Sequence, residues 1–252
     1  MSAPLLETKK LCKAFGKVVT ARDLDLVINQ GELTSIIGPN GAGKSTLINM
    51  LSGALPVDSG QVLFMGRDIT NAPIHARVRM GLCRSFQVVN VFPELSVFDN
   101  VLIPVLAQLG RAGRFFSPLG RERAAREQTM EYLELVGLDH VARRRADALS
   151  HGDQRMLEVA IALAARPKLL FLDEPTAGMN PVERVQVLEN IRRLNDEGRT
   201  SFVIVEHDMD IVFSLSQRVL VLYKGEVICD GPPEHVQGHD RVRECYLGQE
   251  VE

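Results

Sequence analysis

Short apolar stretches alternate along the chain with longer segments whose apolar positions recur every three or four residues. Four of the stretches are apolar at nearly every position, which is typical of parallel strands buried on both faces. Such an alternation predicts a parallel sheet with crossover helices. We expect its strands at Leu33–Ile37, Leu169–Asp173, Ser201–Glu206 and Val219–Tyr223.

The N-terminal region and the middle of the chain depart from this alternation. Leu6–Cys12 and Val18–Ile28 look like antiparallel strands joined by a turn at Phe15, Gly16 and Lys17. From residue 97 to residue 165 helical periodicity replaces the strand pattern, which predicts a helical subdomain inserted into an α/β core. Its helices are expected at Val97–Gln108, Arg121–Val136 and Ser150–Ala165, with an exposed loop at 111–120.

Composition narrows the class of protein. A net charge of −3 argues against nucleic acid as the main partner, since phosphate contacts need a basic face. No apolar run reaches the roughly 18 residues that span a bilayer, and the first residues lack the apolar stretch of a signal peptide. We therefore expect a cytosolic chain that meets a membrane only through a partner. The four cysteines form no metal-binding spacing and are expected to be reduced thiols.

One glycine-rich loop carries the clearest chemistry. Residues 38–46 read GPNGAGKST, follow a predicted strand and open a predicted helix, which is the context of a phosphate-binding loop. Backbone N–H groups of such a loop converge on phosphate oxygens, Lys44 is expected to reach the β- and γ-phosphates, and Ser45 to bind Mg²⁺. The predicted ATP-binding residues here are Gly38, Pro39, Asn40, Gly41, Ala42, Gly43, Lys44, Ser45 and Thr46.

An acidic pair follows the buried strand at residues 169–172. Ligands of open α/β sheets bind at the carboxyl ends of the strands, so Asp173 is expected to hold Mg²⁺, mostly through water. Glu174 stands one residue further on and is the candidate general base for the attacking water. The alternative reading is an acidic N-cap for the helix after Pro175.

The combination of motifs resembles the ATP-binding subunit of ATP-binding-cassette (ABC) transporters over essentially the whole chain. The resemblance implies a P-loop NTPase core with a parallel sheet, an N-terminal antiparallel β subdomain and an inserted α-helical subdomain. It places a single domain at 1–252, with the core at about 1–96 and 166–252 and the helical subdomain at about 97–165. ATP and Mg²⁺ are the implied ligands.

Three further residues match switch and stacking positions of that family. Gln87, in RSFQ, matches a glutamine that senses the γ-phosphate or Mg²⁺, and His207, in VIVEHD, matches a histidine that contacts the γ-phosphate. In isolation His207 also fits a cap for the helix that begins at Asp208. Phe15 matches an aromatic that stacks on adenine, although a core aromatic is the alternative.

The family's signature loop corresponds here to Leu149–Asp153, with Ser150, His151, Gly152 and Asp153 as predicted ATP contacts. Ser150 and Gly152 open a helix, and a helix N-terminus attracts phosphate. In the family this loop serves the ATP of the opposite subunit, so two sites form only in a head-to-tail dimer. His151, Asp153 and, in the following loop, Asn180 depart from the usual residues, and each departure is expected to weaken that contact.

Residues 84–101, 149–164 and 173–183 and the ending YLG resemble the branch that serves branched-chain and other hydrophobic amino acids, whose relatives also move urea, amides or aromatic acids. The resemblance implies two membrane permease subunits, a second ATP-binding subunit, most simply a heterodimer, and an indirectly coupled periplasmic binding protein. It implies a peripheral location at the cytoplasmic face of the inner membrane. A lipopolysaccharide-type exporter and a soluble ABC ATPase are the alternatives, and neither fits this signature loop and single cassette as well.

Overall fold

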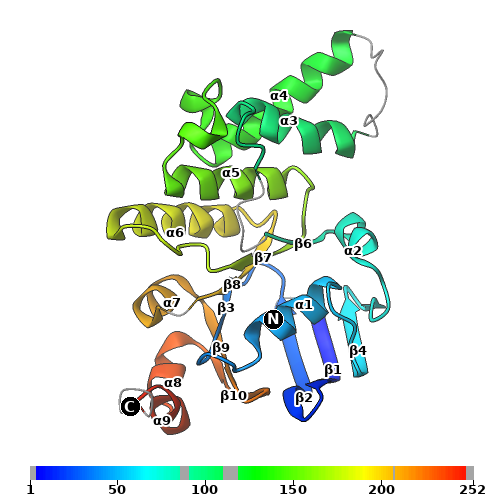
Figure 1. Ribbon diagram of the computed structural model, residues 1–252, viewed down its shortest axis with the longest axis vertical. Helices are drawn as coiled ribbons and strands as arrows, with labels where there is room; N and C mark the ends of the chain where they lie inside the picture. The colour runs from blue at the N-terminus through cyan, green and yellow to red at the C-terminus, as the bar shows by residue number, and fades with distance from the viewer. Residues whose placement is uncertain (1–3, 86–90, 110–118, 207, 248–252) are drawn as a thin grey trace.

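The computed structural model describes residues 4–85, 91–109, 119–206 and 208–247 (Figure 1). A six-stranded sheet with the order β10-β9-β3-β8-β7-β6 forms its centre. Neighbouring strands from β9 to β6 run parallel, and β10 pairs antiparallel with β9. The strands are β3 (Thr34–Ile37), β6 (Leu82–Arg84), β7 (Leu169–Asp173), β8 (Ser201–Val205), β9 (Arg218–Tyr223) and β10 (Glu226–Gly231).

Every residue of β3, β7 and β8 is buried, as expected for strands covered on both faces. The predicted strand at Leu169–Asp173 is confirmed, and the other three differ from the structure by one residue at one end. Glu206 was placed in a strand, but β8 ends at Val205. The register pairs Asp173 with Val205, so these two strands end side by side. Neither β6 nor β10 was predicted from the sequence.

A second, antiparallel sheet has the order β2-β1-β4-β5 and lies beside the first (Figure 1). Its strands are β1 (Pro4–Phe15), β2 (Val18–Asn29), β4 (Ser59–Phe64) and β5 (Arg67–Asp68). The predicted turn at Phe15–Lys17 is corrected here, because Phe15 is the last residue of β1 and pairs with Val18. The turn is therefore only Gly16 and Lys17, and Gly16 supplies the positive φ (60°) that it needs.

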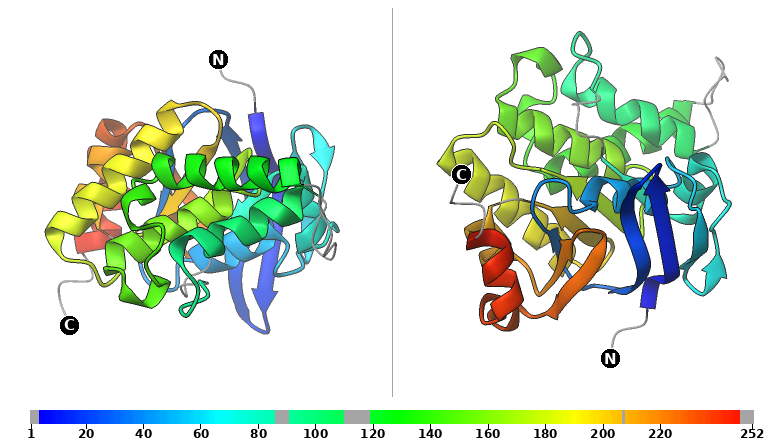
Figure 2. Two further views of the ribbon diagram at one scale, coloured as in Figure 1. Left: turned by 90° about the horizontal axis from the view of Figure 1, so that it is seen from above. Right: turned by 60° about the horizontal axis from the view of Figure 1, so that its bottom comes forward.

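Three helices between β6 and β7 form a layer of their own at one end of the molecule (Figures 1 and 2). They are α3 (Val97–Gln108), α4 (Leu119–Leu135) and α5 (His151–Leu163), close to the predicted helices. Since α4 begins at Leu119, the last two residues of the loop expected at 111–120 are helical. The exact subdomain boundaries at 97 and 165 stay a prediction. The other helices are α1 (Lys44–Ser52), α2 (Ile74–Met80), α6 (Pro181–Asp196), α7 (Met209–Leu215), α8 (Pro233–Gln237) and α9 (Asp240–Leu247).

None of the helices in the described ranges combines the length and the apolar character that a membrane crossing requires.

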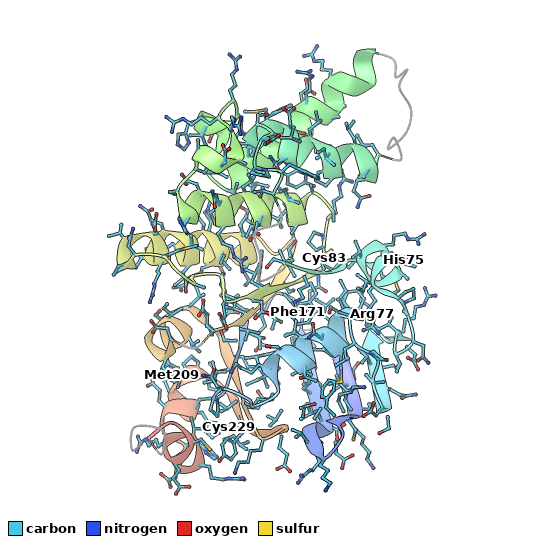
Figure 3. All side chains as sticks on the ribbon, in the orientation of Figure 1. His75, Arg77, Cys83, Phe171, Met209 and Cys229 are labelled. Carbon is cyan, nitrogen blue, oxygen red and sulfur yellow. The ribbon has the colours of Figure 1, made fainter. Side chains whose placement is uncertain are left out.

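Arg77, on α2, is 2% exposed and points toward the C-terminal end of α1 (Figure 3). Its guanidinium donates hydrogen bonds to the carbonyls of Met50 (2.8 Å) and Leu51 (2.7 Å), which lie in the last turn of α1. It also donates to the carbonyls of Thr70 and Ala72, each at 2.9 Å. Burial lowers the pKa of Arg77, and the negative end of the α1 dipole favours the cation. Arg77 therefore fixes the helix that begins at the glycine-rich loop.

Arg77→Met is expected to lower the free energy of unfolding by about 3 kcal/mol or more, because it leaves several buried carbonyls without a donor. Urea denaturation followed by circular dichroism measures the change. Arg79→Met on the exposed face of the same helix is the matched control, with an expected change below about 0.5 kcal/mol. Equal effects of the two substitutions would show that the buried carbonyl contacts contribute little.

Candidate active site

The glycine-rich loop runs from the end of β3 into α1, as the sequence predicts. Gly43 is the N-cap residue of α1 and has a φ of 104°, which disfavours any side chain. A Cβ at Gly43 would lie 2.3 Å from the carbonyl oxygen of Thr20, and one at Gly38 would lie 2.2 Å from that of Leu222. These close approaches reserve both positions for glycine. Asn40, Gly41 and Ser45 are exposed, so the loop and the start of α1 face solvent.

Lys44 is 6% exposed, and its ammonium donates hydrogen bonds to the carbonyls of Gly38 (2.5 Å) and Pro39 (3.0 Å). Burial lowers the pKa of Lys44, while the charges of Glu174 and Asp173 act in the opposite direction. The structure therefore brings the glycine-rich loop and the acidic pair into one electrostatic environment at the carboxyl edge of the sheet.

Asp173 ends the fully buried β7 and is itself 3% exposed. Its carboxylate is held by Arg84, whose Nη2 donates to Oδ2 at 2.7 Å. Nη1 of Arg84 donates to the side-chain carbonyl of Asn49 on α1. Arg84 thus joins the helix of the phosphate loop to the acidic strand. This role of Arg84 was not predicted, although Arg84 opens the RSFQ motif.

Glu174 follows directly and is partly buried, with a φ of 45° that is unusual for a residue with a side chain. Such a conformation costs about 1–3 kcal/mol and persists only where surrounding contacts enforce it. The N–H of Glu174 donates to the carbonyl of Val205 at 2.9 Å. From α5, Nη2 of Arg155 donates to the carbonyl of Asp173 at 2.6 Å, a contact that was not predicted. Both contacts fix the backbone that carries the acidic pair.

The signature loop lies at the start of α5. Ser150 is exposed and is the N-cap residue, accepting a hydrogen bond from the N–H of Asp153 at 3.1 Å. His151 is exposed at the first helical position, and Gly152 is buried against Glu183 on α6. Ser150, Gly152 and Asp153 line a cleft of about 270 Å³ between α5, α6 and the residues that follow α4, and the described residues that line it include none of the glycine-rich loop. Ser150, Gly152 and Asp153 thus belong to a cleft that is separate from the described lining of the chain's own phosphate loop.

Asn180 is the N-cap residue of α6. Its side chain accepts hydrogen bonds from the N–H groups of Val182 and Glu183 (both 3.0 Å), and the carboxylate of Glu183 accepts one from the N–H of Asn180 at 3.3 Å. Asparagine and aspartate cap helices about equally well. The departure at Asn180 therefore leaves this local structure intact.

Phe15 is 51% exposed at the end of β1, so the alternative of a core aromatic is wrong. The ammonium of Lys13 lies 5.5 Å from its ring centroid, and the same ammonium pairs with Asp58 at 2.6 Å. An exposed ring at the end of a strand leaves a face for a planar partner. Stacking on adenine stays a prediction. Gln87 and His207, the two predicted switch residues, lie outside the described residues.

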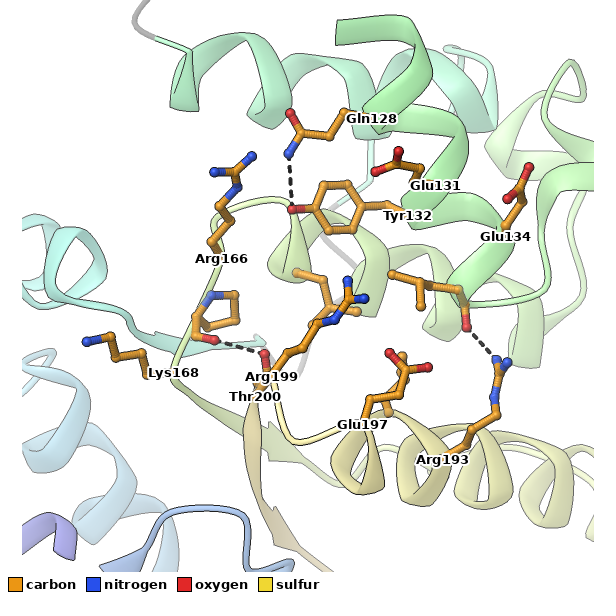
Figure 4. Close-up of a pocket in the computed structure, with 14 residues that line it drawn as sticks. Gln128, Glu131, Tyr132, Glu134, Arg166, Lys168, Arg193, Glu197, Arg199 and Thr200 are labelled. Carbon is orange, nitrogen blue, oxygen red and sulfur yellow. Dashed lines mark hydrogen bonds between the residues drawn. The ribbon is translucent and has the colours of Figure 1, made fainter. Parts of the chain in front are cut away.

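A larger hollow, of about 880 Å³, lies between α4, the segment after α5, and α6 (Figure 4). Arg166 and Lys168 on its wall precede β7, so the hollow is at the opposite edge of the sheet from Asp173. Its charged side chains have both signs and are exposed at the rim. This hollow therefore adds nothing to the candidate active site and favours no single class of ligand.

Comparison with known proteins agrees with this geometry. The ABC transporter family matches residues 21–177, and the family described as branched-chain amino acid ATP-binding cassette transporter matches residues 226–252. The chain is 37% identical, over 99% of its length and 100% of the relative's, to the high-affinity branched-chain amino acid transport ATP-binding protein BraF of Pseudomonas aeruginosa.

Two solved structures give the same result for the fold. The ADP conformation of MJ1267, an ATP-binding cassette of an ABC transporter, has a TM-score of 0.86 and 31% identity, covering 98% of this chain and 100% of that one. A dimeric post-hydrolysis state of the cassette MJ0796, bound to ADP and Pi, has a TM-score of 0.74 and 25% identity, covering 91% and 99%. The fold class predicted from the sequence is confirmed. The chain belongs to the ABC transporter family and is an ATP-binding, ATP-hydrolysing subunit of that family.

Proposed function

We propose that this ATPase energises the import of branched-chain or other hydrophobic amino acids. The single observation that carries the proposal is the full-length similarity to BraF, a branched-chain amino acid transport ATP-binding protein. The C-terminal match at residues 226–252 to the branched-chain family supports the same cargo from a separate part of the chain. Urea, amides and aromatic acids are the related cargoes that the uptake assay below includes.

The proposed site uses the groups at the carboxyl edge of the sheet. The glycine-rich loop and Lys44 bind the ATP phosphates, and Phe15 stacks on adenine. Glu174 acts as general base toward the attacking water, with His207 and Gln87 completing the γ-phosphate contacts. The oxygen donors of Ser45, Asp173 and Gln87 fit Mg²⁺, which when bound neutralises charge on the phosphate oxygens.

The proposed assembly places Ser150, His151, Gly152 and Asp153 against the ATP of a second ATP-binding subunit. Support comes from the exposed N-cap at Ser150, which lines a cleft without any described residue of the chain's own phosphate loop, and from the dimer formed by the similar cassette MJ0796. We propose a heterodimer with a related subunit, bound to two permease subunits at the cytoplasmic face of the inner membrane. A periplasmic binding protein couples to it indirectly, and nucleic acid is not a partner.

Mild-detergent purification of the tagged chain from native membranes tests this proposal. Permease subunits and a second ATP-binding subunit are expected to co-purify, and a strain lacking the chain is expected to lose ATP-dependent leucine uptake, with urea, a short amide and an aromatic acid assayed beside it. Recovery with lipopolysaccharide-export components, with ribosomes or with no partner would contradict the importer. Native leucine uptake with loss of another cargo would contradict only the choice of amino acid.

A further inference from the structure

A buried acidic side chain that the proposed mechanism does not use lies beside the candidate base. Glu206 directly follows β8, is 5% exposed and directly precedes His207. Its Oε1 accepts two hydrogen bonds from Thr176, one from the hydroxyl at 2.7 Å and one from the backbone N–H at 3.2 Å. Thr176 is 3% exposed, so both bonds are shielded from water. Burial of a carboxyl group costs free energy, and hydrogen bonds such as these two offset that cost.

Thr176 belongs to the turn that carries Glu174. The N–H of Glu174 donates to Val205 at 2.9 Å, and the N–H of Ala177 donates to the carbonyl of Glu174 at 3.2 Å. Two consecutive residues at the end of β8, Val205 and Glu206, therefore hold both sides of this turn. Glu174 has its left-handed φ of 45° between them. Removal of one of the two contacts leaves the strained backbone free to relax.

We infer that Glu206 is a positioning residue for hydrolysis: through Thr176 it keeps Glu174 in the strained conformation that aims its carboxylate at the attacking water. The inference rests on the proposed role of Glu174 as general base. Glu206 also directly precedes His207 in the sequence. Neither Glu206 nor Thr176 contacts ATP in this scheme, and the effect of their loss falls on turnover rather than on binding.

Steady-state ATP hydrolysis by the full-length chain, with the subunits that co-purify with it, tests the inference. Glu206→Ala is expected to lower kcat about 100-fold, the cost of a misplacement of about 1 Å, with KM for ATP within twofold of native. Thr176→Val removes one hydroxyl at nearly constant volume and is expected to lower kcat roughly tenfold. Glu206→Gln keeps an acceptor oxygen for both bonds and is expected to recover most of the rate.

Thr200→Val is the matched control for Thr176→Val. Thr200 is also buried, at 6% exposure, and its hydroxyl donates to the carbonyl of Pro167 at 2.8 Å at the other edge of the sheet. The two substitutions are expected to lower the thermal midpoint by similar amounts, and only Thr176→Val is expected to lower kcat. An equal kcat for the two variants, or a raised KM in place of a lowered kcat, overturns the inference.

A double-mutant cycle with Glu174→Gln separates positioning from a general structural role. If Glu206 acts through Glu174, adding Glu206→Ala to Glu174→Gln is expected to lower the residual rate less than threefold. A further loss of about 100-fold in that background overturns the inference, since Glu206 then acts independently of Glu174. Native hydrolysis by Glu174→Gln alone contradicts the proposed base, whereas a slow Glu174→Gln beside a fast Glu206→Ala contradicts only the positioning role.

Discussion

Glu174→Gln is expected to bind ATP with native affinity and to hydrolyse it about a thousandfold more slowly. A glutamine amide has nearly the same volume as the carboxylate and cannot accept the proton of the attacking water, and general-base catalysis contributes typically 10²–10⁴-fold. The backbone of this residue is fixed by the contact between its N–H and Val205, so the substitution leaves the turn unchanged. The loss is therefore expected in turnover alone.

Binding of a fluorescent ATP analogue and single-turnover hydrolysis measure the two properties separately. Because ATP persists in the variant, a dimer is expected to accumulate with ATP and Mg²⁺ on size-exclusion chromatography. Lys44→Ala is the control that removes phosphate contacts, and it is expected to lose nucleotide affinity and form no such dimer. Native turnover by Glu174→Gln would exclude Glu174 as the base. The alternative of an acidic N-cap is wrong, because Asn180 caps the helix that follows Pro175.

Ser150→Arg is expected to leave ATP binding by the isolated chain unchanged and to abolish hydrolysis that depends on a dimer. Ser150 is exposed and lines the cleft between α5, α6 and the residues that follow α4, and the described lining of this cleft includes no residue of the chain's own phosphate loop. A long cationic side chain there blocks the approach of a second subunit, and its charge opposes the positive end of the α5 dipole. Loss of the N-cap bond lowers stability by only about 1 kcal/mol.

Hydrolysis measured over a range of protein concentrations distinguishes these effects. In the presence of the second ATP-binding subunit, the native chain is expected to show a specific activity that rises with concentration, and the variant a flat background. Ser150→Thr keeps an N-cap hydroxyl without the charge and is the matched control, with most of the native rate expected. Hydrolysis at the native rate by Ser150→Arg would mean that this loop contacts no nucleotide.

Residues that act locally could be predicted from the sequence, and residues that act through distant partners could not. The glycine-rich loop and the acidic pair were found because strand, loop and helix follow one another within a few residues. Arg84, Arg155 and Glu206 join segments far apart in the chain, and a single sequence carries no record of such pairs.

The burial of a charged side chain could not be predicted from the sequence either. Arg77 has the sequence context of an exposed helical residue, yet it is nearly inaccessible because carbonyls from α1 and from the loop before α2 converge on it. Short strands were not predicted for a related reason. The three residues of β6 are too few for a period-two pattern, and their place in the sheet is set by pairing with β7.

The bond from Arg155 to the carbonyl of Asp173 has a consequence for how two nucleotides communicate. Ser150 and Arg155 belong to the same end of α5, so a rotation of α5 toward a second subunit either moves the end of β7 or breaks this bond. In a dimer of the proposed kind, Ser150 docks on the ATP of the second subunit, while Glu174 is the base for the ATP of its own chain. The free energy of docking at one nucleotide is thereby linked to the geometry of the base at the other. Linkage of binding free energies is reciprocal, so any change in ATP affinity that docking at one site causes at the other is matched by an equal change in the opposite direction of influence.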